Sequence, residues 1–179
     1  GSKADHLFHV LHFVTREDAL ASTRHLIVMN ENSHINVLES FHSLGAKRYF
    51  TLSVTETLLC QEASIEWHKL QDEGQEAVHF GGHYLKQQEA SELIHHNFAF
   101  GSLLARTDIH TDLSRRSDCT LLGLYSGHGN QHLDSHTRIR HAEPVATSQE
   151  YYKGILNDHS RGVFQGRIIV DQDAQQTDS

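Results

Sequence analysis

The fold is decided by the stretch Tyr152-Lys-Gly-Ile-Leu-Asn-Asp-His-Ser-Arg-Gly-Val-Phe-Gln-Gly-Arg-Ile-Ile-Val-Asp-Gln-Asp-Ala-Gln-Gln-Thr-Asp178. A short apolar pair, Ile155-Leu156, ends one strand, and the polar residues 157–160 form a turn. From Arg161 to Val170 the side chains alternate between two faces, which predicts a second strand. A further turn at Asp171–Asp173 precedes the start of a third strand. Short strands with polar corners and no helix indicate a chain that coils around one axis.

Similar corners recur along the chain. Each follows a polar or acidic residue and precedes a strand-like run, at Ser33, Ala63, Ala90, Ser117, His159 and Ala174, with Ser135 as a poorer fit. These positions span 141 residues in six steps, an average of about 23 or 24, which lies in the range of solenoid repeats. Because the repeat holds several short strands and no helix, the pattern predicts an all-β chain folded as a parallel β-solenoid.

A parallel coil pairs each strand with the turns before and after it, so its polar corners face solvent and its interior fills with stacked side chains. We expect Ile35, Val37, Ile65, Trp67, Leu121 and Ile168 to point inward. Residues 6–14 are expected to form a strand, and Thr15–Thr23 a short helical turn or a loop.

Size and composition exclude several classes of protein. The 179 residues suffice for one domain with a real core, and a hydrophobic content of 37% suits a thin, elongated core. The net charge of −8 gives no basic footprint for nucleic acid, and no apolar run of about 18 residues predicts a membrane span. Cys60 and Cys119 lie far apart, which suggests a reducing compartment. No glycine-rich phosphate loop is present, so ATP binding is not expected.

The 17 histidines raise the alternative of a histidine-rich metal-binding protein. His128, His132 and His136 would share one face of a helix, but the glycines between them disfavour a helix, so we interpret them as exposed strand and loop residues. His95 and His96 should point to opposite faces of one strand, which allows at most one of them inside.

Other reactive side chains have structural interpretations. Cys119 is expected to act as a small buried hydrophobe, and Cys60 lacks a positioned base. Asp108 and Asp112 could share a strand face, which leaves open a β-helix carbohydrate-active enzyme that uses these carboxylates, although solvated sheet surface is the preferred interpretation.

Three linked blocks resemble the core of the SufB/SufD family of iron–sulfur cluster assembly scaffold proteins, and are most similar to its SufD branch. The blocks are Thr137–Pro144 with Thr147-Ser148, Tyr152–Leu156 with Ser160–Arg167, and Asp173–Asp178. The resemblance implies a right-handed parallel β-helix. It also implies a non-catalytic role in the SUF complex of a bacterial cytoplasm, together with a SufB-like partner and a SufC-like ATPase. The full complex handles an iron–sulfur cluster.

The resemblance also sets expectations for individual parts of the chain. Residues 1–3 are expected to be a cloning remnant, and residues 4–179 a single β-helix domain truncated at both ends relative to the family. Without the family's helical parts, this chain is expected to bind no ATPase and no cofactor, and its exposed strand edges to self-associate. No catalytic or metal residue is assigned. The motif residues are expected to be structural: Lys153, Gly154, Arg161, Gly162, Phe164, Gly166, Asp173, Thr177 and Asp178.

Overall fold

The structure, a computed structural model, describes residues 3–45, 47–174 and 176–178, with side chains from residue 7 onward. Alternating β-favourable side chains between polar turns form twelve strands and no helix in these residues. The strands are β1 (Lys3–Val14), β2 (Leu20–Met29), β3 (His34–Ser43), β4 (Phe50–Leu59), β5 (Ser64–Asp72), β6 (Val78–Gln87), β7 (Glu92–Ala99), β8 (Leu104–Leu113), β9 (Asp118–Gly127), β10 (His132–His141), β11 (Thr147–Leu156) and β12 (Arg161–Val170).

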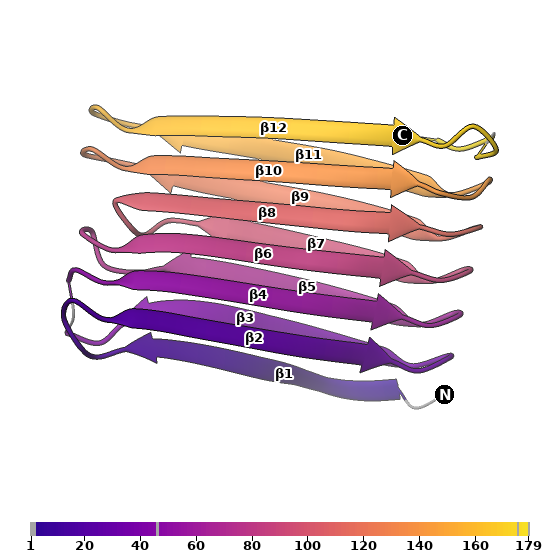
Figure 1. Cartoon of the computed structure of the whole chain (residues 1–179), viewed down its shortest axis with the longest axis horizontal. Coiled ribbons are helices and arrows are strands. Elements are labelled where there is room, and N and C mark those ends of the chain that lie inside the picture. Colours follow the sequence, from indigo (N-terminus) through magenta and orange to yellow (C-terminus); the bar gives the residue numbers. More distant parts are fainter. Residues whose placement is uncertain (1–2, 46, 175, 179) are drawn as a thin grey trace.

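The strands form two facing parallel sheets, one of odd-numbered and one of even-numbered strands (Figure 1). Every turn of the coil contributes one strand to each sheet, so the predicted parallel β-solenoid is confirmed. In Figure 1 the nearer strands run left to right and the farther ones return as the chain climbs, which makes the coil right-handed.

The predicted repeat length was too short. From β2 onward, register partners lie 26 to 30 residues apart, as for Glu92 with Asp118 and His34 with Ser64. The error arose because the predicted corners combined two edges of the coil. His159 lies at the opposite edge, between β11 and β12, and Ser135 lies within β10.

The true corner column runs where each even strand passes to the next odd strand. It consists of Ser33, Ala63, Ser91, Ser117, Ala146 and Ala174, all buried except the half-buried Ser33. Backbone bonds join the corners from turn to turn, as from Glu92 N to Ala63 O at 2.9 Å and from Asp118 N to Ser91 O at 2.9 Å. Each of the first five corners contains a residue with a positive φ of 55° to 67°, at Asn32, Glu62, Ala90, Arg116 and Val145.

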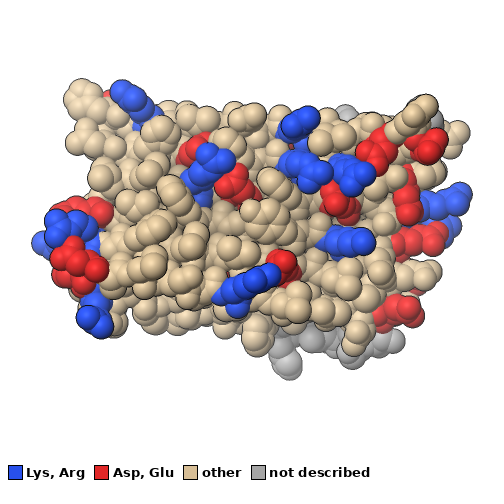
Figure 2. Space-filling view, viewed as in Figure 1, with Lys and Arg blue, Asp and Glu red and all other residues tan. Residues whose placement is uncertain are grey.

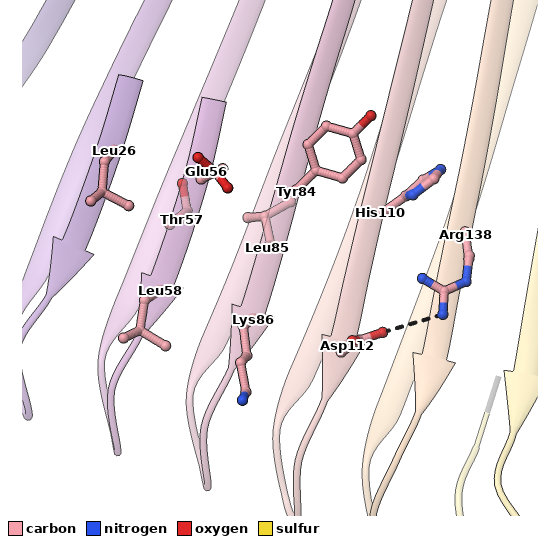
Figure 3. Close-up of a pocket in the computed structure, with 10 residues that line it drawn as sticks. All are labelled: Leu26, Glu56, Thr57, Leu58, Tyr84, Leu85, Lys86, His110, Asp112 and Arg138. Carbon is pink, nitrogen blue, oxygen red and sulfur yellow. Dashed lines mark ion pairs between the residues drawn. The ribbon is translucent and has the colours of Figure 1, made fainter. Parts of the chain in front are cut away.

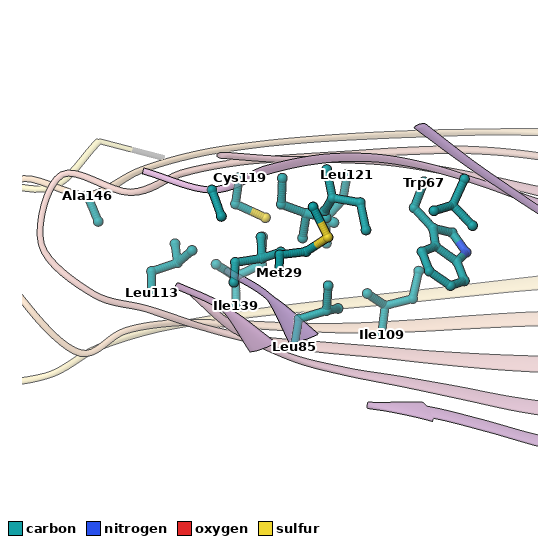
Figure 4. Close-up of a cluster of buried hydrophobic side chains, with 14 residues drawn as sticks. Met29, Trp67, Leu85, Ile109, Leu113, Cys119, Leu121, Ile139 and Ala146 are labelled. Atoms are coloured by element: carbon teal, nitrogen blue, oxygen red, sulfur yellow. The ribbon is translucent and has the colours of Figure 1, made fainter. Parts of the chain in front are cut away.

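The apolar core lies next to this corner column (Figure 4). Register stacks its side chains in rows, of which one is Ile35, Ile65, Leu93 and Cys119. Of the residues predicted to point inward, Val37, Ile65, Trp67 and Leu121 are buried and Ile35 packs against the core. Ile168 pairs with the buried Ile139 and so faces inward, but it is 45% exposed because β12 is the last strand of its sheet.

One boundary differs from the sequence-based expectation. Residues 15–19 do form a turn, but Leu20–Thr23 belong to β2, where Ser22 and Thr23 alternate as in any strand. Of the expected cloning remnant, Lys3 begins β1, while Gly1 and Ser2 lie outside the described residues. The expected third strand of the C-terminal stretch begins at Asp178, which forms a parallel bridge with Thr147.

Candidate functional site

The motif glycines lie beneath aromatic rings. Tyr125 in β9 is the register partner of Gly154 in β11, and its ring fills the space that a side chain at Gly154 would occupy. A Cβ atom at Gly162 would lie 2.5 Å from the same ring. Phe164 stacks on Tyr152 with ring centroids 4.5 Å apart. At Gly166, a Cβ atom would lie 2.7 Å from the Glu150 carboxylate.

The charged motif residues face solvent. Lys153, Arg161 and Arg167 are exposed and form no ion pair with the described residues. Asp173 lies in the last corner, and Asp178 accepts a backbone bond from Ser148 at 2.9 Å, next to the half-buried Thr177. The structure therefore brings the glycines and rings together in the last two turns but gathers no cluster of motif cations.

The half of the interior farther from the corner column is polar, and its charged part is the interior polar cluster of Glu39, Lys69, Glu73 and His79. All four are at most 4% exposed. Glu39 in β3 is the register partner of Lys69 in β5. Glu73 lies 2.7 Å from His79 Nδ1 and accepts hydrogen bonds from Thr51 Oγ1 at 2.6 Å and Gln71 Nε2 at 3.1 Å. Buried charges persist only with such partners.

The partners also determine the charge states in this cluster. Burial raises the pKa of the Glu73 carboxyl, but hydrogen bonds and the charge of His79 outweigh burial and lower it below its usual value. Burial alone would also raise the pKa of the Glu39 carboxyl. The interaction with His12 and the charge of Lys69 outweigh burial and lower this pKa below its usual value. Burial lowers the pKa of Lys69. The charges of Glu39 and Glu73 act in the opposite direction, but burial has the larger effect. The cluster therefore places two acidic side chains and one lysine together in the interior, and the pKa of each is below its usual value.

Neutral histidines adjoin the interior polar cluster. Burial lowers the pKa of His83 to about 4, and it lowers the pKa of His95 well below its usual value. His83 Nε2 lies 2.8 Å from Thr57 Oγ1, whereas both ring nitrogens of His95 and Trp67 Nε1 have no hydrogen-bond partner in the described residues. Buried polar atoms of this kind usually bind ordered water, so this part of the interior can bind small polar molecules such as water.

Sequence reasoning missed the interior polar cluster, although a signal existed. Glu39 follows Val37 and Lys69 follows Trp67 at a spacing of two, so both charges lie on the inward face that the apolar residues define. The prediction for His95 and His96 was correct, because His95 is fully buried and His96 lies on the outer face. Cys119 is buried, as expected, and burial raises the pKa of its thiol; Cys60 is half-buried and free.

The outer face of the even-strand sheet carries a shallow groove with a volume of about 360 Å³ (Figure 3). Asp112 lies in it with Oδ1 3.7 Å from Arg138 Nη2, and the Tyr84 and His110 rings meet edge to face at 5.2 Å. Figure 2 shows this face with charges of both signs interspersed, rather than one basic patch.

The groove lacks the geometry of a glycosidase. Asp108 and Asp112 share the outer face of β8, as expected, but they lie four steps apart along the strand, which separates their backbones by about 13 Å, beyond the roughly 5 to 9.5 Å of catalytic carboxylate pairs. Asp108 is also held by two hydrogen bonds of 3.0 Å from Arg106.

The histidines singled out from the sequence do not converge. His128 lies in a turn, and His132 and His136 point outward from β10 four residues apart. In the described residues, two other groups bring three metal-ligating atoms within 4.8 Å of one another: Glu66, His68 and His96, and His12, His25 and Glu39. The spacing of His68 and His96, 28 residues, equals the local repeat, but only the true register reveals it. Burial and the neighbouring His68 lower the pKa of His96.

The described residues form no helix that could cross a membrane. Known proteins resemble this chain along most of its length. It is 29% identical over 174 residues to the iron–sulfur cluster assembly protein SufD of Escherichia coli, which covers 96% of this chain and 41% of the relative. A SufBD family protein of Synechocystis is 22% identical over 169 residues, covering 89% and 37% respectively. Protein ABCI7, chloroplastic, of Arabidopsis thaliana is 27% identical over 166 residues, covering 89% and 34%.

The chain thus spans about two fifths or less of the length of these relatives. No solved structure gives a significant match. The family model for the SufBD core domain of the SUF system of iron–sulfur cluster assembly matches residues 12–179, which include the end of β1 and all strands from β2 to β12. This chain belongs to the SufBD core-domain family of the SUF system.

Proposed function

We propose that the chain is the β-helical core of a non-catalytic scaffold component of a SUF iron–sulfur cluster assembly complex. The observation that carries the proposal is the match to the SufBD core domain over residues 12–179, together with similarity to E. coli SufD over 96% of the chain. In this proposal a SufB-like protein and a SufC-like ATPase are the partners, the cluster is cargo of the whole complex, and the compartment is the bacterial cytoplasm.

The packing of the motif residues supports a scaffold role. We propose that the motif residues from Lys153 to Asp178 are structural, since the glycines make room for Tyr125 and the polar residues form corners.

Reconstitution with purified components tests this proposal. The full-length protein that contains this chain is mixed with the SufB-like protein and the ATPase, and the mixture is separated by size-exclusion chromatography. We expect one complex that contains all three proteins and supports cluster formation, followed by absorbance. Separate elution of the full-length protein would overturn the proposal.

A second arm tests where the ATPase binds. Residues 1–179 alone are used in a pull-down with the ATPase, and we expect no retention because the contact is proposed to lie in other parts of the full-length protein. Tight retention of the ATPase on residues 1–179 would overturn that assignment. A glycan-hydrolysis assay of wild-type and Asp112→Asn protein tests the carbohydrate-active alternative, for which we expect no activity.

A further inference from the structure

Two imidazoles and one carboxylate converge on the outer face of the odd-strand sheet. Strand alternation places Glu66 and His68 on the same face of β5, two residues apart. Parallel register places His96 of β7 directly opposite His68. We propose that Glu66, His68 and His96 form a binding site for one first-row divalent transition-metal ion, with Zn²⁺ as the representative.

The distances suit a single ion. Glu66 Oε1 lies 3.4 Å from His68 Nε2 and 3.8 Å from His96 Nδ1, and the three ligand atoms lie within 4.8 Å of one another. In a tetrahedral site with metal–ligand bonds of about 2.0 to 2.1 Å, neighbouring ligand atoms are about 3.4 Å apart. Small rotations of side chains on a rigid sheet would therefore close the site. A water molecule would complete the coordination, because the three side chains are 22% to 36% exposed.

A second observation points to a missing ligand. His96 Nδ1 is buried and has no hydrogen-bond partner in the described residues. The ring of His96 stacks on His68, with centroids 4.7 Å apart at an angle of 11°, and lies 6.3 Å from the Phe98 ring at 2°. The two imidazoles would tilt out of this stack to direct both nitrogens at one ion. A buried imidazole nitrogen without a hydrogen bond is costly, and a metal ion would satisfy it.

The surroundings favour this cluster over the other one. An apolar hollow of about 150 Å³ adjoins His96 and is lined by Phe98, Leu122 and Tyr151, which lowers the local dielectric constant beside the ligands. In the other group, Glu39 faces the buried ammonium group of Lys69, which repels a cation. For the first group, the ion pairs of the described residues include no Lys or Arg partner of Glu66.

The test is a Zn²⁺ titration of the untagged chain by isothermal titration calorimetry, with a parallel anaerobic Fe²⁺ titration. We expect one strong site per chain for at least one of the two ions. His68→Ala, His96→Ala and Glu66→Gln should each weaken binding at least tenfold. His132→Ala, an outward histidine of β10 outside both groups, and His25→Ala, from the other group, should leave binding unchanged.

Binding that survives His68→Ala combined with His96→Ala would overturn the proposal, as would loss of binding on His25→Ala or no strong site for either ion. If a variant misfolds by circular dichroism, the wild-type protein is titrated with Co²⁺ instead. Intense visible d–d bands of a four-coordinate ion, with paramagnetic shifts of the His68 and His96 ring protons, are the supporting result. Shifts confined to other histidines would contradict it.

Discussion

The ring of Tyr152 in β11 occupies the space in which a side chain at its register partner, Gly123 in β9, would lie. Two residues further along each strand the arrangement is reversed, with Tyr125 in β9 over Gly154 in β11. In this reciprocal exchange between adjacent turns, each strand contributes one ring and one glycine, and each ring packs over the glycine of the other strand. This exchange gives a packing reason for Tyr152 and Gly154 in the motif.

Gly123→Ala should therefore destabilise the fold by about 1 to 3 kcal/mol, because the new methyl group overlaps the Tyr152 ring. Chemical denaturation of the variant measures the effect. Tyr152→Leu removes the ring, so the double variant should lose less stability than the sum of the two single variants. Additive losses would show that the two sites do not interact.

Lys69 should stabilise the interior polar cluster. Lys69→Met removes the neighbouring charge that lowers the pKa of the buried Glu39 carboxyl, and we expect a loss of stability of about 1 to 3 kcal/mol. Adding Glu39→Gln should recover part of this loss, because the unpaired charge is then removed. Urea denaturation of both variants measures their free energies of unfolding. A double variant less stable than Lys69→Met would contradict the expected recovery.

Stability should fall in mild acid because of His83. Its pKa is about 4 in the folded protein against about 6.5 when unfolded, so the unfolded chain binds the proton more readily. The neutral His83 contributes about 3 kcal/mol to the free energy of unfolding. This contribution is complete above pH 6.5 and is lost as the pH falls towards 4. Denaturation midpoints measured from pH 7.5 to 4 should fall less steeply in His83→Gln than in wild-type protein. His132→Gln, on the exposed face of β10, is the control and should keep the wild-type slope.

Val145 has a φ of 67°, which is unfavourable for a β-branched residue. Val145→Gly should therefore stabilise the protein by about 1 kcal/mol. Ala90→Gly provides the matched control, because Ala90 has a φ of 56° at the equivalent corner but no branched side chain, and its gain should be smaller. Thermal melting compares the two variants, and a lower melting temperature for Val145→Gly would refute the expectation.

The strands were predictable because alternation and polar corners are local signals. Residues 25–29, 35–41 and 161–170 lie in strands, as their patterns predict, and the predicted strand 93–100 extends one residue beyond the end of β7. The period was not predictable in the same way, because polar turns occur at both edges of the coil and look alike in the sequence, as His159 between β11 and β12 shows. An error of a few residues in the period misaligns whole strands.

The metal-ligating group and the interior polar cluster could be predicted only with the correct repeat length. His68 and His96, and likewise Glu39 and Lys69, become neighbours only through register across turns. Strand alternation could assign His95 to the interior, but it could not show which groups face it from other turns. Composition made the histidines conspicuous without indicating which of them meet.

The two-sheet order has a consequence for motion. Each strand from β3 to β10 hydrogen-bonds to one strand of the preceding turn and one of the following turn, so local stability is transmitted only between nearest neighbours. Local unfolding of the described coil should therefore begin in its first and last turns and progress towards the middle turns. Amide protons in the middle turns, where the interior polar cluster and His95 are enclosed, would be the last to exchange with solvent.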